Sequence, residues 1–91
     1  MVYIYAVHKS EDTDVIEKVK CTNHFGIEQD SDKTKEFMIE FINAHPDSVM
    51  TMYKRGTSWY SGEYVHVVDN EYLRTDSNKI QADNLGNLIE Y

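Results

Sequence analysis

KTKEFMIEFINA, residues 33–44, decides the fold class, because it carries a clear helical period in a chain that otherwise tends to alternate. At about 100° per residue, four apolar side chains fall within an arc of about 140°: Phe37, Met38, Phe41 and Ile42. Polar residues occupy the opposite side: Lys33, Glu36, Glu40 and Asn43. The pattern predicts one amphipathic helix that packs on the protein through the four apolar side chains.

The residues that flank this stretch mark the ends of the helix. Ser31 or Asp32 can cap its start, because either side chain can accept hydrogen bonds from the first free amides. Pro46 disfavours helical geometry at His45, so we expect the helix to end there. Ile39 lies off the apolar arc, and the helical period assigns it no role.

Two strands are predicted before the helix. Residues 1–8 are dense in Val, Tyr and Ile at both parities, which is typical of a central strand covered on both faces. Residues 15–22 alternate as a half-exposed strand does, with lysines on one side and three apolar residues on the other: Val15, Val19 and Cys21. The polar cluster at 10–14 favours a short turn, so we expect the two strands to pair antiparallel.

The period of two returns after Pro46. Residues 49–54 are predicted as a third strand, Arg55-Gly56 begins a turn, and residues 58–60 add further strand. A hairpin is predicted from residues 63–68 and 71–75, because Asp69-Asn70 between them are residue types that tolerate positive φ.

These elements predict an α+β fold in ββαββ order, as a single domain over residues 1–91. An antiparallel sheet of four or five strands carries the helix on one face. The tail, residues 76–91, has irregularly spaced apolar residues and is expected to pack on the domain with one short helical turn. We find no repeat or linker in the chain.

The composition favours a protein partner over nucleic acid. Nine Lys and Arg against sixteen Asp and Glu give a net charge of 9 − 16 = −7, which repels phosphate backbones and favours a basic partner. Cys21 is the one cysteine, and an unpaired thiol suits a reducing cytosol. Neither a signal peptide nor a membrane span is recognisable, so we expect a cytoplasmic protein with no membrane association.

The C-terminal third carries a distinctive pattern. It comprises Tyr72-Leu73-Arg74-Thr75, then Asn78, then Asp83-Asn84-Leu85 and Leu88. This pattern resembles a family of short bacterial and phage proteins of unknown function (DUF3892), over roughly residues 59–88. Ile89 stands where that family commonly has proline, although isoleucine can take the extended conformation that proline imposes. The family carries no established activity, cofactor or catalytic residue, so the resemblance implies a bacterial or phage setting and transfers no functional residue.

Aromatic and cationic side chains gather between residues 53 and 64. The candidate binding residues are Tyr53, Arg55, Trp59, Tyr60 and Tyr64. Such a mixture can stack on bases or hold an anionic ligand, and Trp59 and Tyr60 are residue types that anchor interfaces. The competing interpretation is a structural hairpin, in which the aromatics cover a small sheet while the cations sit in the turn.

The sequence offers little for catalysis. Cys21-x-x-His24 has the spacing of half a zinc site, but no second closely spaced pair supplies the other ligands. No nucleophile motif surrounds Cys21, and no phosphate-binding glycine motif is present. We therefore expect no metal, no cofactor and no enzyme activity.

Two hypotheses of function remain. The first is a cytoplasmic protein-interaction module, such as a phage or mobile-element accessory or inhibitor protein, that acts stoichiometrically on a basic partner through a sheet edge or the Trp59-Tyr60 loop. The second is a small-molecule or nucleotide sensor that uses the 53–64 segment as its pocket.

Overall fold

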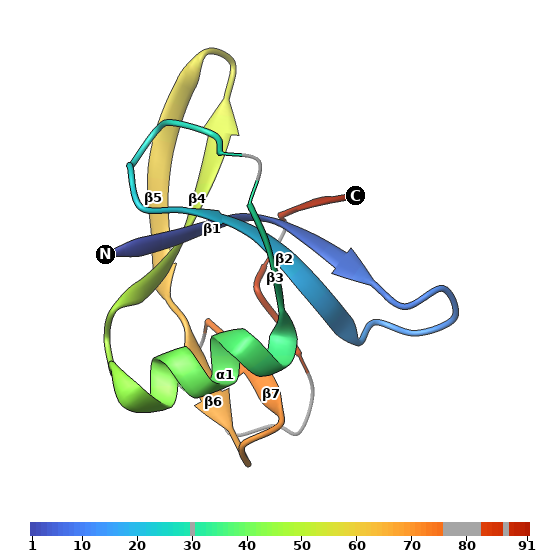
Figure 1. The fold of residues 1–91 in the computed structure, drawn as a ribbon. Coiled ribbons are helices and arrows are strands. Elements are labelled where there is room, and N and C mark those ends of the chain that lie inside the picture. Colours follow the sequence, from blue (N-terminus) through green and yellow to red (C-terminus); the bar gives the residue numbers. More distant parts are fainter. Residues whose placement is uncertain (30, 76–82, 87) are drawn as a thin grey trace.

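The computed structural model describes residues 1–29, 31–75, 83–86 and 88–91. Its central strand is β1, Val2–Lys9, which is buried through its middle, as the sequence predicts. β2, Ile16–Thr22, pairs antiparallel with one side of β1. The other side of β1 is shared by two parallel neighbours, β4 (Val49–Arg55) and β8 (Ile89–Glu90). β1 therefore organises the whole sheet (Figure 1).

The remaining elements complete an α+β fold. β3 (Asp32–Thr34) and β5 (Ser58–Tyr64) are the outer strands, giving the order β3-β2-β1-β4-β5 with β8 beside β1. The helix α1 (Lys35–Ala44) packs on the sheet together with a separate two-stranded hairpin, β6 (His66–Val68) and β7 (Tyr72–Arg74). The α+β class and the mostly antiparallel sheet are confirmed.

The predicted ββαββ order was wrong. β3 precedes the helix, β8 joins the sheet from the tail, and β6–β7 stand apart from the main sheet. Both β3 and β8 form by backbone pairing with strands that lie elsewhere in the sequence. With only two or three residues each, they are too short for a pattern of alternating polar and apolar residues to predict them. Among the residues that the structure describes, the sheet consequently has six strands, and its β1–β4 and β1–β8 pairs are parallel.

The inward parity at the start of β2 was also predicted wrongly. The β1–β2 register shifts between the pairs His8↔Lys18 and Lys9↔Ile16. This irregularity turns Ile16 into the core, where it is 2% exposed, and leaves Val15 45% exposed. A bulge reverses the inside-outside alternation that the sequence pattern assumes.

The helix differs from its prediction in both cap and orientation. Its N-cap is Thr34, whose hydroxyl accepts the Phe37 amide at 3.1 Å, rather than Ser31 or Asp32, because the residues before it belong to β3. Phe37 is 46% exposed, whereas Ile39 is 7% exposed and packs in the core beside Met38 and Ile42. The helix is rotated about its axis so that Lys35 and Ile39 face inward, which gives Ile39 the role that the helical period did not.

Two hydrophobic clusters lie on opposite faces of the sheet. The larger one fills the space between the sheet, α1 and the β6–β7 hairpin, with Ile4, Val19, Met38 and Leu73 at its centre. The smaller one consists of Tyr5, Ala6 and Met52, with Tyr3, Trp59 and Tyr91 packed against it. The second face is thus covered by aromatic side chains, with no helix over it in the described residues.

The two C-terminal hairpins are built on local turn chemistry. Asp69 and Asn70 have φ of 52° and 54°, and Glu71 N donates to Val68 O, so the turn predicted between β6 and β7 is confirmed. β4 and β5 are joined at Gly56, whose φ of 60° fits the first central position of a type II′ turn. β5 extends to Tyr64, beyond the predicted 58–60, while the strand after it begins only at His66.

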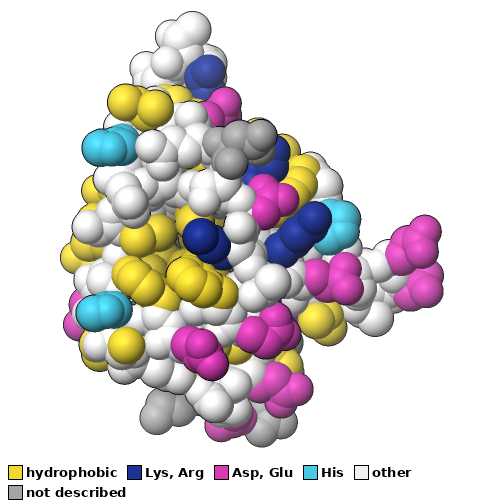
Figure 2. Space-filling model, in the orientation of Figure 1, with side chains coloured by type: hydrophobic (Ala, Val, Ile, Leu, Met, Phe, Trp, Pro, Cys, Tyr) yellow, Lys and Arg dark blue, Asp and Glu magenta, His cyan; other side chains and the backbone are white. Residues whose placement is uncertain are grey.

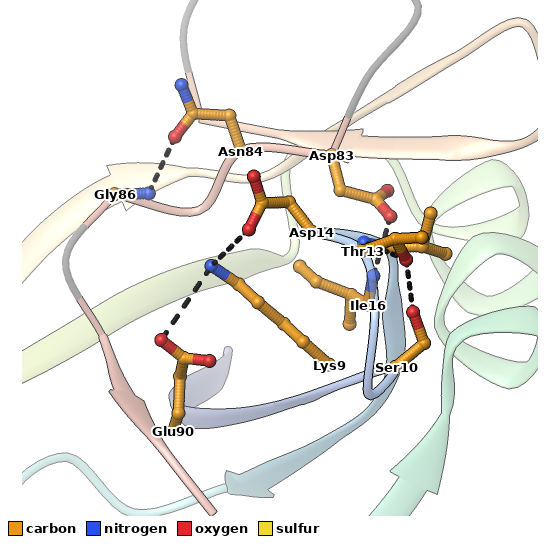
Figure 3. A network of polar contacts seen from close by, with 10 residues as sticks. Lys9, Ser10, Thr13, Asp14, Ile16, Asp83, Asn84, Gly86 and Glu90 are labelled. Atoms are coloured by element: carbon orange, nitrogen blue, oxygen red, sulfur yellow. Dashed lines mark hydrogen bonds and ion pairs between the residues drawn. The ribbon is translucent and has the colours of Figure 1, made fainter.

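The described part of the tail is tied to the sheet by one buried carboxylate. Asp83 accepts the Ile16 amide at 2.8 Å, the Leu73 amide at 2.9 Å and Lys35 Nζ at 2.8 Å. Nearby, Asn84 Oδ1 accepts the Gly86 amide, and Lys9 lies between Asp14 and Glu90 (Figure 3). The predicted packing of the tail is confirmed at Leu85, which is 4% exposed, whereas Ile80 lies outside the described residues.

Within the residues that the structure describes, no helix is long and apolar enough to cross a membrane.

Candidate functional site

The five residues singled out in the sequence all lie on the β4–β5 hairpin, which projects from the sheet (Figure 1). Tyr53 and Tyr60 are cross-strand partners, and their rings stack at 5.7 Å with an interplanar angle of 23°. The Arg55 guanidinium lies 5.5 Å from the centre of the Tyr53 ring. Trp59 packs against the smaller hydrophobic cluster on the sheet, and Tyr64 lies at the end of β5 farthest from the turn. The hairpin therefore presents two separate surfaces, an outer edge and an inner edge.

The outer edge belongs to β5. In the described residues β5 pairs with β4 alone, so its other side has no strand neighbour. Tyr60 is 47% exposed and Tyr64 is 41% exposed, whereas Trp59 is half-buried. These exposures leave two tyrosines available for contact along this edge.

The hydrogen-bonding pattern of the hairpin indicates which backbone groups point outward. Arg55 and Ser58 flank the two-residue turn, so they form the hydrogen-bonded pair that closes it. Hydrogen-bonded and non-hydrogen-bonded pairs alternate along an antiparallel ladder. Trp59 and Ser61 on β5 therefore direct their N–H and C=O groups away from β4, toward the open edge. By the same alternation, Lys54 directs its backbone groups toward the β1 side of β4.

The inner edge of the hairpin borders a cavity. β1 pairs with β4 as far as Ile4↔Thr51 and then, from Ala6↔Ile89, with β8. β4 and β8 diverge from this point, and a cavity of about 490 Å³ lies between the hairpin and the tail. Its lining includes Tyr5, Tyr53, Lys54, Arg55, Trp59, Glu63, Leu88 and Ile89. The structure thus brings Tyr53, Arg55 and Trp59 to one cavity and places Tyr60 and Tyr64 outside its lining.

Trp59 forms part of the cavity wall with restricted freedom. Its ring meets the Tyr5 ring edge-on at 6.2 Å, and its side chain packs against the cluster of Tyr5, Ala6 and Met52. Lys54 Nζ lies 5.8 Å from the centre of the indole ring. Contact on several sides holds Trp59 in place.

Several residues of this site were not predictable from local sequence. Tyr5 lies in β1, and Leu88 and Ile89 lie in the tail, so the fold brings them beside residues 53–59 from far along the chain. Gly62 is also required, because a Cβ there would lie 2.1 Å from the Thr51 hydroxyl oxygen. No motif in the sequence marks these positions.

Cys21 lies in β2 and is 6% exposed, while His24 lies in the loop that follows. Burial raises the pKa of the Cys21 thiol above its ordinary value of 9.0, although the nearby Lys33 charge partly offsets this effect. A buried, protonated thiol is a poor nucleophile and a poor metal ligand. No group of three or more His, Cys, Asp or Glu side chains that could hold a metal ion was found among the described residues.

The fold and the hairpin define a small α+β protein with an open sheet edge and an adjoining cavity. The chain belongs to the family described as "Protein of unknown function (DUF3892)", which matches residues 3–89. No curated protein matches the chain, and neither does any solved structure.

Several residues of the C-terminal pattern noted in the sequence make contacts that stabilise the fold. Leu73 is fully buried in β7, Asp83 ties the tail to three other elements, and Leu85 packs in the core. Asn84 N donates to Leu73 O at 2.8 Å. Ile89 is in β8, with the extended backbone expected of it, and Asn78 lies outside the described residues. The described pattern residues thus have folding contacts that account for them.

Proposed function

We propose that this protein is an interaction module that binds an extended segment of a basic partner protein along the outer edge of β5. The observation that supports this function is the open β5 edge, with outward backbone groups at Trp59 and Ser61 and exposed rings at Tyr60 and Tyr64. A peptide that adds a strand to a sheet gains main-chain hydrogen bonds, while alternate side chains determine specificity.

Part of β5 lacks the features that commonly protect a sheet edge. Proteins commonly protect an edge strand with lysine, proline, a bulge or a very short length. β5 is seven residues long, SWYSGEY, and contains neither lysine nor proline. Its pairing with β4 is irregular between Met50↔Tyr64 and Met52↔Ser61, where the bulge twists the edge. The regular part, residues 58–61, is the expected docking segment.

The charge of the protein favours a basic partner. The net charge is −7, and Figure 2 shows Asp and Glu side chains gathered over the part of this face where α1 lies and at the tip of the β1–β2 hairpin. These carboxylates are not concentrated on the β4–β5 hairpin. Their expected role is to attract a basic protein and orient its approach, which raises the association rate at low salt. An accessory or inhibitor protein of a phage or mobile element, acting stoichiometrically in the cytoplasm, fits this mode of binding.

The test uses a proline that removes one outward donor from the edge. Ser61→Pro deletes the Ser61 N–H, which points away from β4, and so should leave the β4–β5 ladder intact. Ser61→Ala is the matched control, because it removes the hydroxyl and retains the N–H. Tagged wild type and both variants are used to capture partners from nuclease-treated bacterial lysate at low and moderate salt, after circular dichroism has verified their folding.

We expect one basic protein to bind wild type and Ser61→Ala, to be lost with Ser61→Pro, and to bind less at moderate salt. Equal capture by both variants would exclude the β5 edge. Capture that does not weaken with salt would contradict the charge argument. Self-association of the wild type through the edge, without a second protein, would replace the basic partner by another copy of this chain.

A further inference from the structure

We propose that the cavity on the inner edge of the β4–β5 hairpin binds a small anion with a planar ring, of the class of nucleoside monophosphates. This site lies on the inner side of the hairpin, although Trp59 and Ser61 of β5 also line it, and it does not depend on the function proposed for the outer edge. It is argued from the topology of β1, the rings and cations of the cavity lining, and the local charge.

The topology of the sheet creates the cavity. β4 and β8 both run parallel to β1, and the neighbour of β1 changes from one to the other at Tyr5. A crevice remains where β4 leaves β1 and β8 takes its place, and the cavity lies there. Lys54 lies beyond the last β1–β4 pair, Ile4↔Thr51, so its backbone groups on the β1 side have no strand partner in the described residues. They are available to a ligand.

The lining supplies apolar and aromatic surface for a planar ring. Trp59, Tyr5 and Tyr53 contribute aromatic rings, and Leu88 and Ile89 form apolar wall from the tail. A base stacks favourably on an aromatic side chain, and the stacking depends little on the identity of the base. The volume of about 490 Å³ falls within the usual range of small-molecule sites.

The same lining supplies a local positive charge. Lys54 and Arg55 both line the cavity and both have exposed side chains, while Glu63 is the acidic residue among the described members of the lining. The described lining residues therefore carry 2 − 1 = +1, in a chain whose net charge is −7. Arg can hold a phosphate through two parallel hydrogen bonds, and Lys acts as a compact cationic donor. Two cations beside aromatic rings suit a ring-bearing phosphate better than a neutral ligand.

The intrinsic fluorescence of the protein provides a direct test, because Trp59 is the one tryptophan of the chain and lies in the cavity wall. Adenosine monophosphate is titrated into the protein, and adenosine and inorganic phosphate are titrated separately. Calorimetry repeats each titration with a readout that does not depend on Trp59. The variants are Lys54→Gln and Arg55→Gln, with Lys33→Gln as the matched control. Lys33 lies in β3, at the opposite edge of the sheet, and its removal changes the net charge equally.

We expect saturable binding of adenosine monophosphate, weakened at least about tenfold by Arg55→Gln and also weakened by Lys54→Gln, since hydrogen bonds to charged groups are the stronger class. Lys33→Gln should leave the affinity unchanged, and adenosine or phosphate alone should bind more weakly. The proposal is overturned by no saturable response to the nucleotide. It is equally overturned if Lys33→Gln weakens binding as much as the cavity variants, or if adenosine or phosphate alone binds as tightly as the nucleotide.

Discussion

Replacing Asp83 by Asn is predicted to destabilise the protein strongly. The Asp83 side chain is 1% exposed and the side chain of its partner Lys35 is 9% exposed. Oδ2 accepts both Lys35 Nζ and the Ile16 amide, while Oδ1 accepts the Leu73 amide. An asparagine of the same size has one carbonyl oxygen, so in either orientation its NH₂ group would face at least one of these donors.

The magnitude follows from the groups that lose a partner. Removing one member of a buried ion pair typically costs about 3–5 kcal/mol, because the other charge is left buried and unpaired. A buried amide without an acceptor adds about 1–3 kcal/mol. We therefore expect Asp83→Asn to cost at least about 3 kcal/mol, a large fraction of the total of about 5–15 kcal/mol that holds a typical domain folded.

Urea unfolding, monitored by circular dichroism, measures this cost. Asp14→Asn is the matched control, because Asp14 also touches the tail network, through Lys9 at 4.0 Å, but its side chain is 96% exposed (Figure 3). The control should stay within about 0.5 kcal/mol of wild type. Lys35→Met combined with Asp83→Asn should cost less than the sum of the single changes, since no buried charge remains unpaired. A cost for Asp83→Asn no larger than that of the control would refute the reasoning.

Three further predictions concern other parts of the fold. Gly62→Ala should destabilise the protein by about 1–3 kcal/mol through overlap with the Thr51 hydroxyl, and Thr51→Ala in the same chain should recover part of this loss in urea unfolding. Cys21 should react with a thiol reagent slowly in the native protein and rapidly in urea, because burial raises its pKa and blocks access; fast native labelling would contradict this. Burial, with the nearby Asp32 charge, raises the pKa of Tyr91 from 10.0 to about 12, so the folded state retains the phenol proton that the unfolded state loses. Stability should therefore fall as pH rises from 10.0 to about 12, and by less in Tyr91→Phe; an identical fall in both proteins would exclude this role.

Local patterns in the sequence predicted those elements that depend on their own residues. The helix, the central strand and the Asp69-Asn70 turn are of this kind, because period and turn chemistry act within a few residues. The orientation of the helix is different. Lys35 turns inward to Asp83, 48 residues away, and Ile39 follows it one turn later on the same side. Phe37 is consequently left exposed, which no helical period could indicate.

The candidate site also has one part that the sequence could predict and one part that it could not. The hairpin that carries Tyr53, Arg55 and Trp59 could be found in the sequence, because its residue types are distinctive over a short stretch. The opposite wall of the cavity could not be found, since Tyr5 and Ile89 reach it through the parallel pairing of β1 with β4 and β8. Parallel neighbours need long connections, so sequence proximity carries no information about them.

The contacts of the C-terminal pattern also limit what family membership can predict. Asp83, Asn84 and Leu85 are accounted for by the ion pair with Lys35, by backbone pairing with β7 and by burial in the core. A protein that shares these residues needs them to place the tail against β2, α1 and β7, whatever it binds. The tail in turn forms one wall of the cavity, so its anchoring is a structural requirement of the proposed ligand site.

In the proposed site, the choice of ligand depends on residues that face the cavity and do not hold the fold together. Lys54 and Arg55 meet both conditions, because they line the cavity and remain exposed at the end of the hairpin. Differences at these two positions, rather than in the C-terminal pattern, are therefore where a change of ligand should be sought.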